Sequence, residues 1–109
     1  MVKRRVLWTL PAQRDLESIV QYIAEQQPAT ALNVLNRLQA RAVCLVSQTS
    51  RGRRVPELRD MGINNHREII EAPWRLIYRP ADKHVYIIAV FDARRDLRGI
   101  LMERLLQLP

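Results

Sequence analysis

The fold of this chain is decided by one stretch, Arg51-Gly52-Arg53-Arg54-Val55-Pro56-Glu57-Leu58, and by two segments after it, Arg67-Glu68-Ile69-Ile70 and Trp74-Arg75-Leu76-Ile77-Tyr78-Arg79. A basic turn leads into a short extended segment, and the two later segments mix arginines with β-forming residues. Successive side chains of a strand point to opposite faces. In the second segment, Arg75 and Arg79 should therefore share one face with Ile77. A strand with arginines at alternate positions presents a cationic face to a partner.

Outward from this stretch, the first half of the chain is predicted to be helical. Leu16, Ile19, Val20 and Ile23 follow the spacing of one apolar helix face. Pro28 suits the first turn of a second helix, so the two helices should form an antiparallel hairpin. The predicted elements are a strand at 3–8, a helix at 10–26, a helix from 28 that ends at 48–52, strands at 66–72, 74–79 and 84–92, and a helix at 95–107.

The order β-α-α-β-β-β-α predicts an α+β fold in a single domain spanning residues 1–109. We expect the helical hairpin to pack on a small antiparallel sheet, with the C-terminal helix added to it. The last strand, Val85–Phe91, is apolar on both faces. It is therefore predicted to be a central strand that is covered on both sides.

The charge of the chain points to an anionic partner. The 109 residues carry 18 basic and 11 acidic side chains, a formal net charge of +7, and only Lys3 and Lys83 are lysines. Arginine makes planar, bidentate contacts with carboxylate and phosphate groups. The partner could be a nucleic acid, an enzyme that acts on nucleic acid, or an acidic protein. A codon bias of the host genome would also explain the arginine content.

The remaining composition predicts a cytoplasmic protein. The single cysteine, Cys44, lies in an apolar helical run, where we expect a buried, inert thiol, and one cysteine allows no disulfide within the chain. No apolar window is long enough to span a membrane. The basic N-terminus is followed by Pro11 and polar residues instead of the apolar core of a signal peptide.

No motif for a metal or a cofactor is visible. His66 and His84 have no partner at ligand spacing and are interpreted as surface or strand-end histidines. The chain has no glycine-rich phosphate loop and no nucleophile elbow. What remains is a basic surface formed by Arg51, Arg53, Arg54, Arg67, Arg75, Arg79, Arg94 and Arg95. The alternative interpretation is solvated charge with ordinary ion pairs to Glu57, Glu68, Glu71 and Asp96.

Several short pieces occur in a characteristic order along nearly the whole chain. They are Trp8-Thr9, Asp15-Leu16 with Ile19 and Tyr22-Ile23-Ala24, Pro28 with Ala31, Gly52-Arg53 with Val55-Pro56-Glu57-Leu58, Arg67-Glu68-Ile69, Trp74–Arg79 and Ala93-Arg94-Arg95-Asp96. In this order and spacing they resemble the ParE branch of the ParE/RelE superfamily of bacterial toxin–antitoxin toxins.

This resemblance implies a cytoplasmic bacterial toxin, encoded beside a small antitoxin that wraps and neutralises it. ParE toxins act on DNA gyrase and so stop replication, whereas RelE toxins of similar fold cleave mRNA on the ribosome. One position departs from the family pattern. Family members often carry histidine before the late Arg-Arg piece, and here Asp92 occupies that place.

Two functions are consistent with this resemblance, a gyrase inhibitor without catalysis and an RNA-cleaving toxin. RNA cleavage through the 2′-hydroxyl needs an acid and a base, and arginine is a poor proton shuttle because of its high pKa. After Tyr86 the chain contains no tyrosine, histidine or lysine. We therefore favour the gyrase inhibitor and expect no catalytic residue. An inactive relic that only binds antitoxin is the third reading.

Two sets of site residues follow from these expectations. The partners are expected to be the antitoxin, in a toxin–antitoxin hetero-oligomer, and gyrase, with operator DNA reached only through the antitoxin. The candidate target-binding residues are Arg51, Arg53, Arg54, Arg75, Arg79, Arg94 and Arg95. The candidate antitoxin-binding residues are Ile77, Tyr86, Ile88, Val90, Leu97, Ile100 and Leu101.

Overall fold

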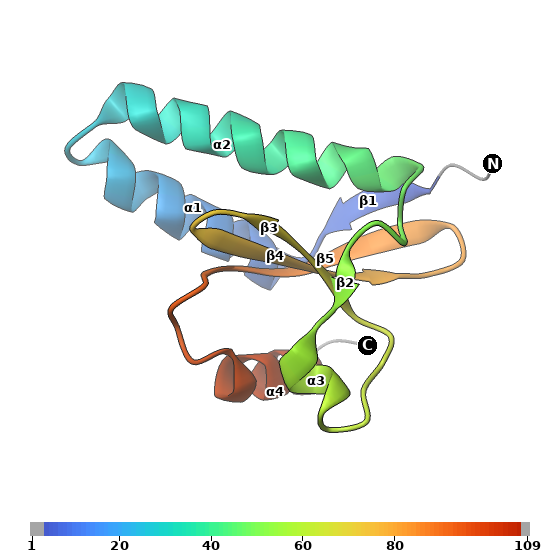
Figure 1. Ribbon diagram of the computed structural model, residues 1–109. Coiled ribbons are helices and arrows are strands. Elements are labelled where there is room, and N and C mark those ends of the chain that lie inside the picture. Colours follow the sequence, from blue (N-terminus) through green and yellow to red (C-terminus); the bar gives the residue numbers. More distant parts are fainter. Residues whose placement is uncertain (1–3, 108–109) are drawn as a thin grey trace.

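A computed structural model describes residues 4–107 of the chain and confirms the predicted α+β fold. Figure 1 shows a helical hairpin above a twisted sheet and two further helices below it. The elements are β1 (Arg5–Trp8), α1 (Leu10–Ala24), α2 (Pro28–Val43), the 3-10 turn η1 (Cys44–Val46), β2 (Arg53–Arg54), α3 (Pro56–Arg59), β3 (Arg67–Glu71), β4 (Trp74–Pro80), β5 (His84–Asp92) and α4 (Leu97–Gln107).

The five strands form one sheet in the order β1-β5-β4-β3-β2. The pairs β2–β3, β3–β4 and β4–β5 are antiparallel, as expected for the sheet. β1, in contrast, pairs with β5 in parallel. The sheet is thus mixed. The helical hairpin α1–α2 separates β1 in sequence from the later strands, and this long connection allows β1 to pair in parallel with β5. β5 lies between β1 and β4, which confirms the prediction of a central last strand.

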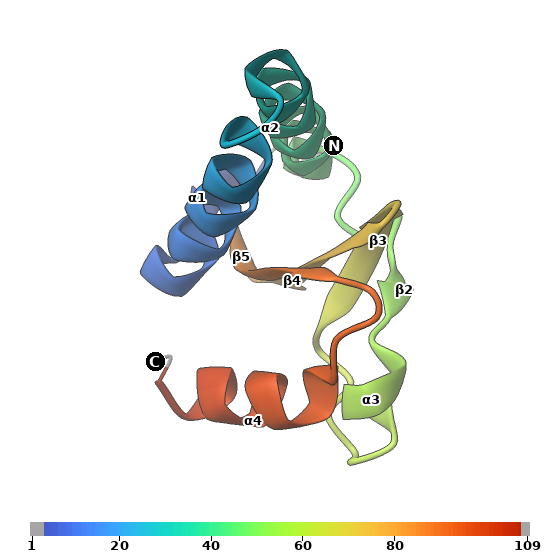
Figure 2. The same ribbon diagram turned by 90° about the vertical axis from the view of Figure 1, so that its left-hand side faces the viewer.

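Each face of the sheet has its own apolar core, as the two-sided pattern of β5 predicted. The upper core joins the α1–α2 hairpin to Leu76, Tyr78 and Ile87. The lower core joins α3 and α4 to Ile77 and Ile88 (Figure 2). Adjacent residues of β4 thus enter opposite cores, which places the arginines of this strand on the lower side.

The start of each hairpin helix follows from local sequence. The Thr9 hydroxyl accepts a hydrogen bond from the Ala12 N–H at 3.4 Å and so caps α1, while Pro11 occupies its first turn. Pro28 opens α2, since its missing N–H would have no helical partner there. The Thr9 hydroxyl also donates to the carbonyl of Ile87 at 2.8 Å, which ties the start of α1 to the central strand.

Three details differ from the sequence predictions. The four-residue helix α3 was not predicted, because it is too short to show apolar periodicity. Cys44 is exposed instead of buried, at the start of the 3-10 turn η1 that follows α2. His66 does precede β3, as expected for a strand-end histidine, but its side chain is buried and not on the surface.

Candidate functional site

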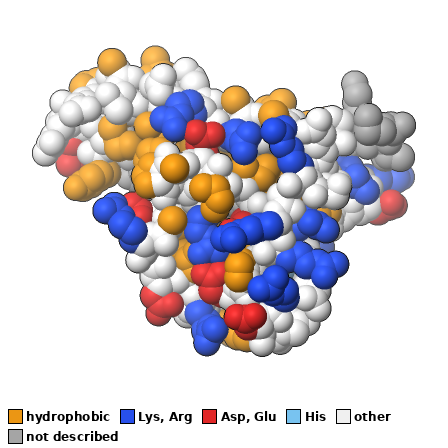
Figure 3. Space-filling view, in the orientation of Figure 1, with side chains coloured by type: hydrophobic (Ala, Val, Ile, Leu, Met, Phe, Trp, Pro, Cys, Tyr) orange, Lys and Arg blue, Asp and Glu red, His pale blue; other side chains and the backbone are white. Residues whose placement is uncertain are grey.

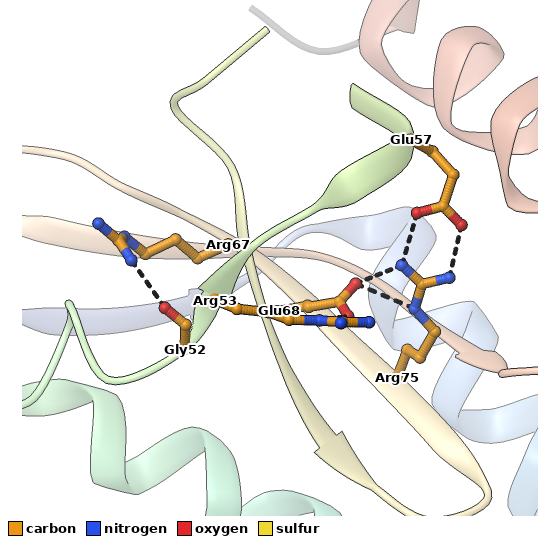
Figure 4. A network of polar contacts seen from close by, with 6 residues as sticks. All are labelled: Gly52, Arg53, Glu57, Arg67, Glu68 and Arg75. Carbon is orange, nitrogen blue, oxygen red and sulfur yellow. Dashed lines mark hydrogen bonds and ion pairs between the residues drawn. The ribbon is translucent and has the colours of Figure 1, made fainter. Parts of the chain in front are cut away.

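The guanidinium of Arg75 is the centre of a buried ion-pair network on the lower side of the sheet (Figure 4). Its Nη1 and Nη2 donate to the two carboxylate oxygens of Glu57 at 2.6 and 2.8 Å. Its Nε donates to Oε1 of Glu68 at 2.9 Å, and Nη2 donates to the same oxygen. With 8% of its side chain exposed, Arg75 is enclosed by acceptors and does not face solvent.

Strand register brings a second arginine to the same carboxylate. Arg53 on β2 stands opposite Glu68 on β3, and its Nε donates to Glu68 Oε2 at 2.7 Å. The Glu68 side chain is 0% exposed, whereas 63% of the Arg53 side chain is exposed. Glu68 therefore anchors Arg53 while most of the Arg53 side chain remains exposed.

The ion pair between Arg75 and Glu57 shifts the pKa of both groups. Hydrogen bonds from Arg75 lower the pKa of Glu57 to about 2, against the opposing effect of desolvation. The same pair raises the pKa of Arg75 above its ordinary value. We define Arg53, Glu57, Glu68 and Arg75 as the Arg75 network. Its ion pairs join two arginines to two glutamates and connect β2, α3, β3 and β4.

The basic turn that leads into β2 is held against the sheet at Gly52. Tyr78 accepts a hydrogen bond from the Gly52 N–H at 3.0 Å and donates its hydroxyl proton to the Thr49 carbonyl at 2.7 Å. Arg67 Nη1 donates to the Gly52 carbonyl at 2.7 Å. A Cβ at Gly52 would collide with the carbonyl oxygen of Glu68, so this close approach requires glycine.

A different cationic feature lies at the end of β5, in the turn formed by residues 92–95. Asp92 Oδ1 accepts from the Arg94 N–H at 2.9 Å and from Arg94 Nε at 3.0 Å, and Oδ2 accepts from Nη2 at 2.7 Å. These bonds lower the pKa of Asp92 to about 2. Arg94 is nonetheless 86% exposed. The guanidinium of Arg95 lies 5.5 Å from the centre of the Phe91 ring.

The other candidate arginines are spread over the surface. Arg79 lies over the Tyr86 ring, with 4.9 Å between its guanidinium carbon and the ring centre. Arg51 donates to the side chain of Gln48 at 3.0 Å, and Arg54 is exposed. Lysine and arginine side chains gather in the middle and lower right of the face drawn in Figure 3, with acidic side chains between them. The structure thus separates the predicted arginine set into a buried network, an exposed turn and scattered cations.

The predicted antitoxin-binding residues do not form one exposed surface in this structure. Four of them lie in the lower core between the sheet and α4, and Tyr86 and Ile100 are half-buried at its margin. Val90 belongs instead to the upper core. α4 covers the apolar side of the sheet that the sequence suggested for a partner. The four fully covered residues are Ile77, Ile88, Leu97 and Leu101.

One contact that the sequence analysis missed fixes α4 to the hairpin. Arg104 of α4 donates to both oxygens of Asp15 on α1, at 2.8 and 3.1 Å, and to the Ile88 carbonyl at 2.9 Å. Asp15 also accepts from the Val90 N–H at 3.1 Å. Asp15 and Arg104 are 89 residues apart in the sequence, so no local pattern could reveal this ion pair.

Two further properties concern the part of the chain from residue 4 to residue 107. Within it, no group of three histidine, cysteine, aspartate or glutamate side chains could hold a metal ion. None of the helices described there is both long and apolar enough to cross a membrane.

Comparison with known proteins identifies a family whose sequence model matches most of this chain. The model of the family described as the ParE toxin of the type II toxin–antitoxin system parDE matches residues 6–97, from β1 to the first residue of α4. No curated protein matches the sequence.

Two solved structures share the fold. The chromosomal ParDE toxin–antitoxin system from P. aeruginosa aligns with 19% identity and a TM-score of 0.67, covering 84% of this chain and 98% of that chain. The toxin–antitoxin complex RelBE2 from Mycobacterium tuberculosis aligns with 23% identity and a TM-score of 0.61, covering 84% of this chain and 93% of that chain. At these identities the likeness concerns the fold alone.

Proposed function

The chain belongs to the family of ParE toxins of type II toxin–antitoxin systems, and we propose that it inhibits DNA gyrase without catalysis and thereby blocks replication. A cognate antitoxin neutralises it in a toxin–antitoxin hetero-oligomer in the bacterial cytoplasm, and operator DNA is contacted only through that antitoxin. The solved toxin–antitoxin complexes of the same fold support the antitoxin as a partner.

One observation carries the choice of a non-catalytic toxin, the environment of Asp92. This residue occupies the position where the family often has histidine, and Arg94 lowers its pKa to about 2. At neutral pH the carboxylate is therefore ionised and already engaged by Arg94. A general acid or base works best with a pKa near the operating pH, so Asp92 is poorly suited to transfer a proton.

The runner-up is a ribosome-dependent mRNA-cleaving toxin, because the RelBE2 complex has a similar fold. Its best candidate group is Tyr86, whose ring lies beside the Arg79 guanidinium. This arrangement offers one titratable group, whereas cleavage through the 2′-hydroxyl requires both an acid and a base.

The test is expression without an antitoxin, followed by two assays of the purified protein. We expect growth arrest on induction, inhibition of supercoiling by purified gyrase on a relaxed plasmid, and intact mRNA on programmed ribosomes. The Tyr86→Phe variant is the matched control, because it removes the phenol and keeps the ring. Cleavage of ribosome-bound mRNA that is lost in Tyr86→Phe, with gyrase unaffected, would establish the runner-up.

A further inference from the structure

Four arginines lie at the loop that leads from η1 into β2. Arg4 donates from Nη1 to the Thr49 hydroxyl at 3.0 Å, and Arg67 donates from Nη1 to the Gly52 carbonyl at 2.7 Å (Figure 4). These acceptors are neutral oxygens, so they do not balance the charge of either guanidinium. We define the Gly52 cluster by its four members, Arg4, Arg51, Arg54 and Arg67. Within residues 4–107, no carboxylate forms an ion pair with any member.

Strand pairing brings two members of the Gly52 cluster face to face. Arg54 of β2 stands directly opposite Arg67 of β3. Residues paired in this way share one face of the sheet, and like charges at such positions destabilise it. Arg53, the neighbour of Arg54, points to the opposite face and pairs with Glu68. The charge is therefore balanced within the chain on one face of this strand pair and left unbalanced on the other, which favours an anion from outside the chain.

The composition of the loop distinguishes between two kinds of anionic partner. Residues 48–54 read Gln-Thr-Ser-Arg-Gly-Arg-Arg and contain no apolar side chain. The core of a protein–protein interface is apolar and depleted in charged residues, so this loop does not fit such a core. Phosphate groups of nucleic acids, in contrast, are bound by arginine together with serine, threonine and glutamine side chains. The loop therefore favours a nucleic acid over an acidic protein.

The surroundings of Tyr78 favour a duplex over a single strand. Tyr78 bonds to Thr49 and Gly52 and is 0% exposed, so its ring is not available to stack on a base. Residues 48–54 contain no aromatic side chain. Proteins that bind single strands without sequence preference stack the bases on aromatic side chains. A duplex keeps its bases stacked inside and presents its phosphates to basic side chains.

We propose that the Gly52 cluster binds the phosphate backbone of duplex DNA directly and without sequence preference. Arg51 and Arg54, which are both exposed, make the phosphate contacts, while Arg4 and Arg67 hold the loop in position. This contact belongs to the toxin without its antitoxin, so it goes beyond the proposed function, in which the antitoxin recognises the operator. The choice of DNA rests on the proposed function, because gyrase acts on duplex DNA.

The test is the fluorescence anisotropy of a short labelled DNA duplex without operator sequence, titrated with the purified full chain. Arg51→Gln/Arg54→Gln removes two exposed charges from the cluster, and Arg59→Gln/Arg98→Gln removes two exposed charges from α3 and α4. We expect the first double variant to raise the Kd about tenfold or more at low salt. The slope of log K against log salt should also fall by about two, one for each lost phosphate contact. The second double variant has the same net charge and should stay within about twofold of the unmodified protein.

Three outcomes would overturn the proposal. The first is an unmodified protein that does not bind the duplex at low salt. The second is an equal loss of binding in the two double variants, which would mean that net charge attracts DNA without a defined site. The third is tighter binding of the corresponding single strand, which contradicts the choice of a duplex. The assay contains no gyrase, so its result is independent of whether the protein inhibits that enzyme.

Chemical protection tests the same contact in the unmodified protein, so its result does not depend on how the variants fold. Phenylglyoxal modifies exposed guanidinium groups, and mass spectrometry locates the modified arginines. Bound duplex DNA is expected to slow the modification of Arg51 and Arg54 and to leave the rates at Arg59 and Arg98 unchanged. Equal protection at all four positions, or no protection at Arg51 and Arg54, would contradict the proposed site.

Discussion

Arg75 and Arg94 are both held by carboxylates of this chain, in surroundings that differ in depth. Arg75 donates four hydrogen bonds to Glu57 and Glu68 with 8% of its side chain exposed, whereas Arg94 is 86% exposed and folds back on Asp92 two residues earlier. The first pairing joins β4 to α3 and β3. The second closes a turn within one segment, so it fixes little beyond its own loop.

The difference in burial distinguishes arginines that stabilise the fold from arginines that are available to a partner. A buried charge that loses its partner is strongly unfavourable, while an exposed pair contributes little to stability. We therefore expect Arg75 to stabilise the fold, and we propose that the exposed turn of residues 92–95 contacts the target. Arg53 stands between these cases, since its anchor Glu68 is buried and its own guanidinium is not.

Arg75→Ala should give the largest effect on stability. The substitution leaves the buried carboxylate of Glu68 with only Arg53, and breaking a buried pair in this way typically costs about 3–5 kcal/mol. We expect chemical denaturation to show a loss of this size, with inhibition lost because the protein unfolds. A loss below about 1 kcal/mol would place Arg75 with the exposed arginines.

Acid titration should distinguish the two carboxylates, whose pKa values are both lowered to about 2. The lowered pKa of Glu57 gives stability that is present above about pH 4.5 and lost as the pH falls toward 2. Asp92 pairs with a neighbour two residues away, which also lies close in the unfolded chain, so its contribution is small and screened by salt.

The measurement is the free energy of unfolding between pH 6 and pH 2. Glu57→Gln is expected to flatten the loss below pH 4.5, and Asp92→Asn is expected to leave the curve unchanged. The reverse pattern would show that the exposed turn, and not the Arg75 network, stabilises the fold.

Arg53→Ala should have an intermediate effect. Glu68 keeps its bonds to Arg75 in this variant, so we expect a loss of about 1 kcal/mol, the size of a single hydrogen bond to a charged group at a partly exposed site. Denaturation of Arg53→Ala beside Arg54→Ala checks this, because Arg54 is the exposed neighbour on the same strand. Equal stability of the two variants would mean that the ion pair between Arg53 and Glu68 does not stabilise the fold.

Much of the fold could be predicted from the sequence because its signals are local. Periodic apolar residues such as Leu16 and Ile19 indicated the first helix, and alternation in Trp74–Arg79 indicated the faces of β4, both as observed. Two contacts connect segments that are distant in the sequence: the parallel pairing of β1 with β5 and the ion pair between Asp15 and Arg104. A local sequence pattern cannot predict such contacts.

The candidate site was harder to predict, because sequence does not report burial of charge. Arg75 and Arg94 have the same side chain and both have acidic residues within reach, so they received the same role. The fold separates them by placing Glu57 and Glu68 around Arg75. For the same reason, the sequence did not reveal that the apolar residues of β5 and α4, which it suggested for a partner, pack against each other in this structure.

The smallest effect on stability, and the most direct test of the account, belongs to the double variant Arg94→Ala/Arg95→Ala. Its thermal unfolding and its inhibition of gyrase supercoiling are measured together, beside the unmodified protein. We predict no measurable change in the midpoint of thermal unfolding, because both side chains are exposed, and at least about a tenfold loss of inhibition. Full inhibition by a folded double variant would contradict the assignment of this turn to the target, and a large drop in stability would show that these arginines hold the fold.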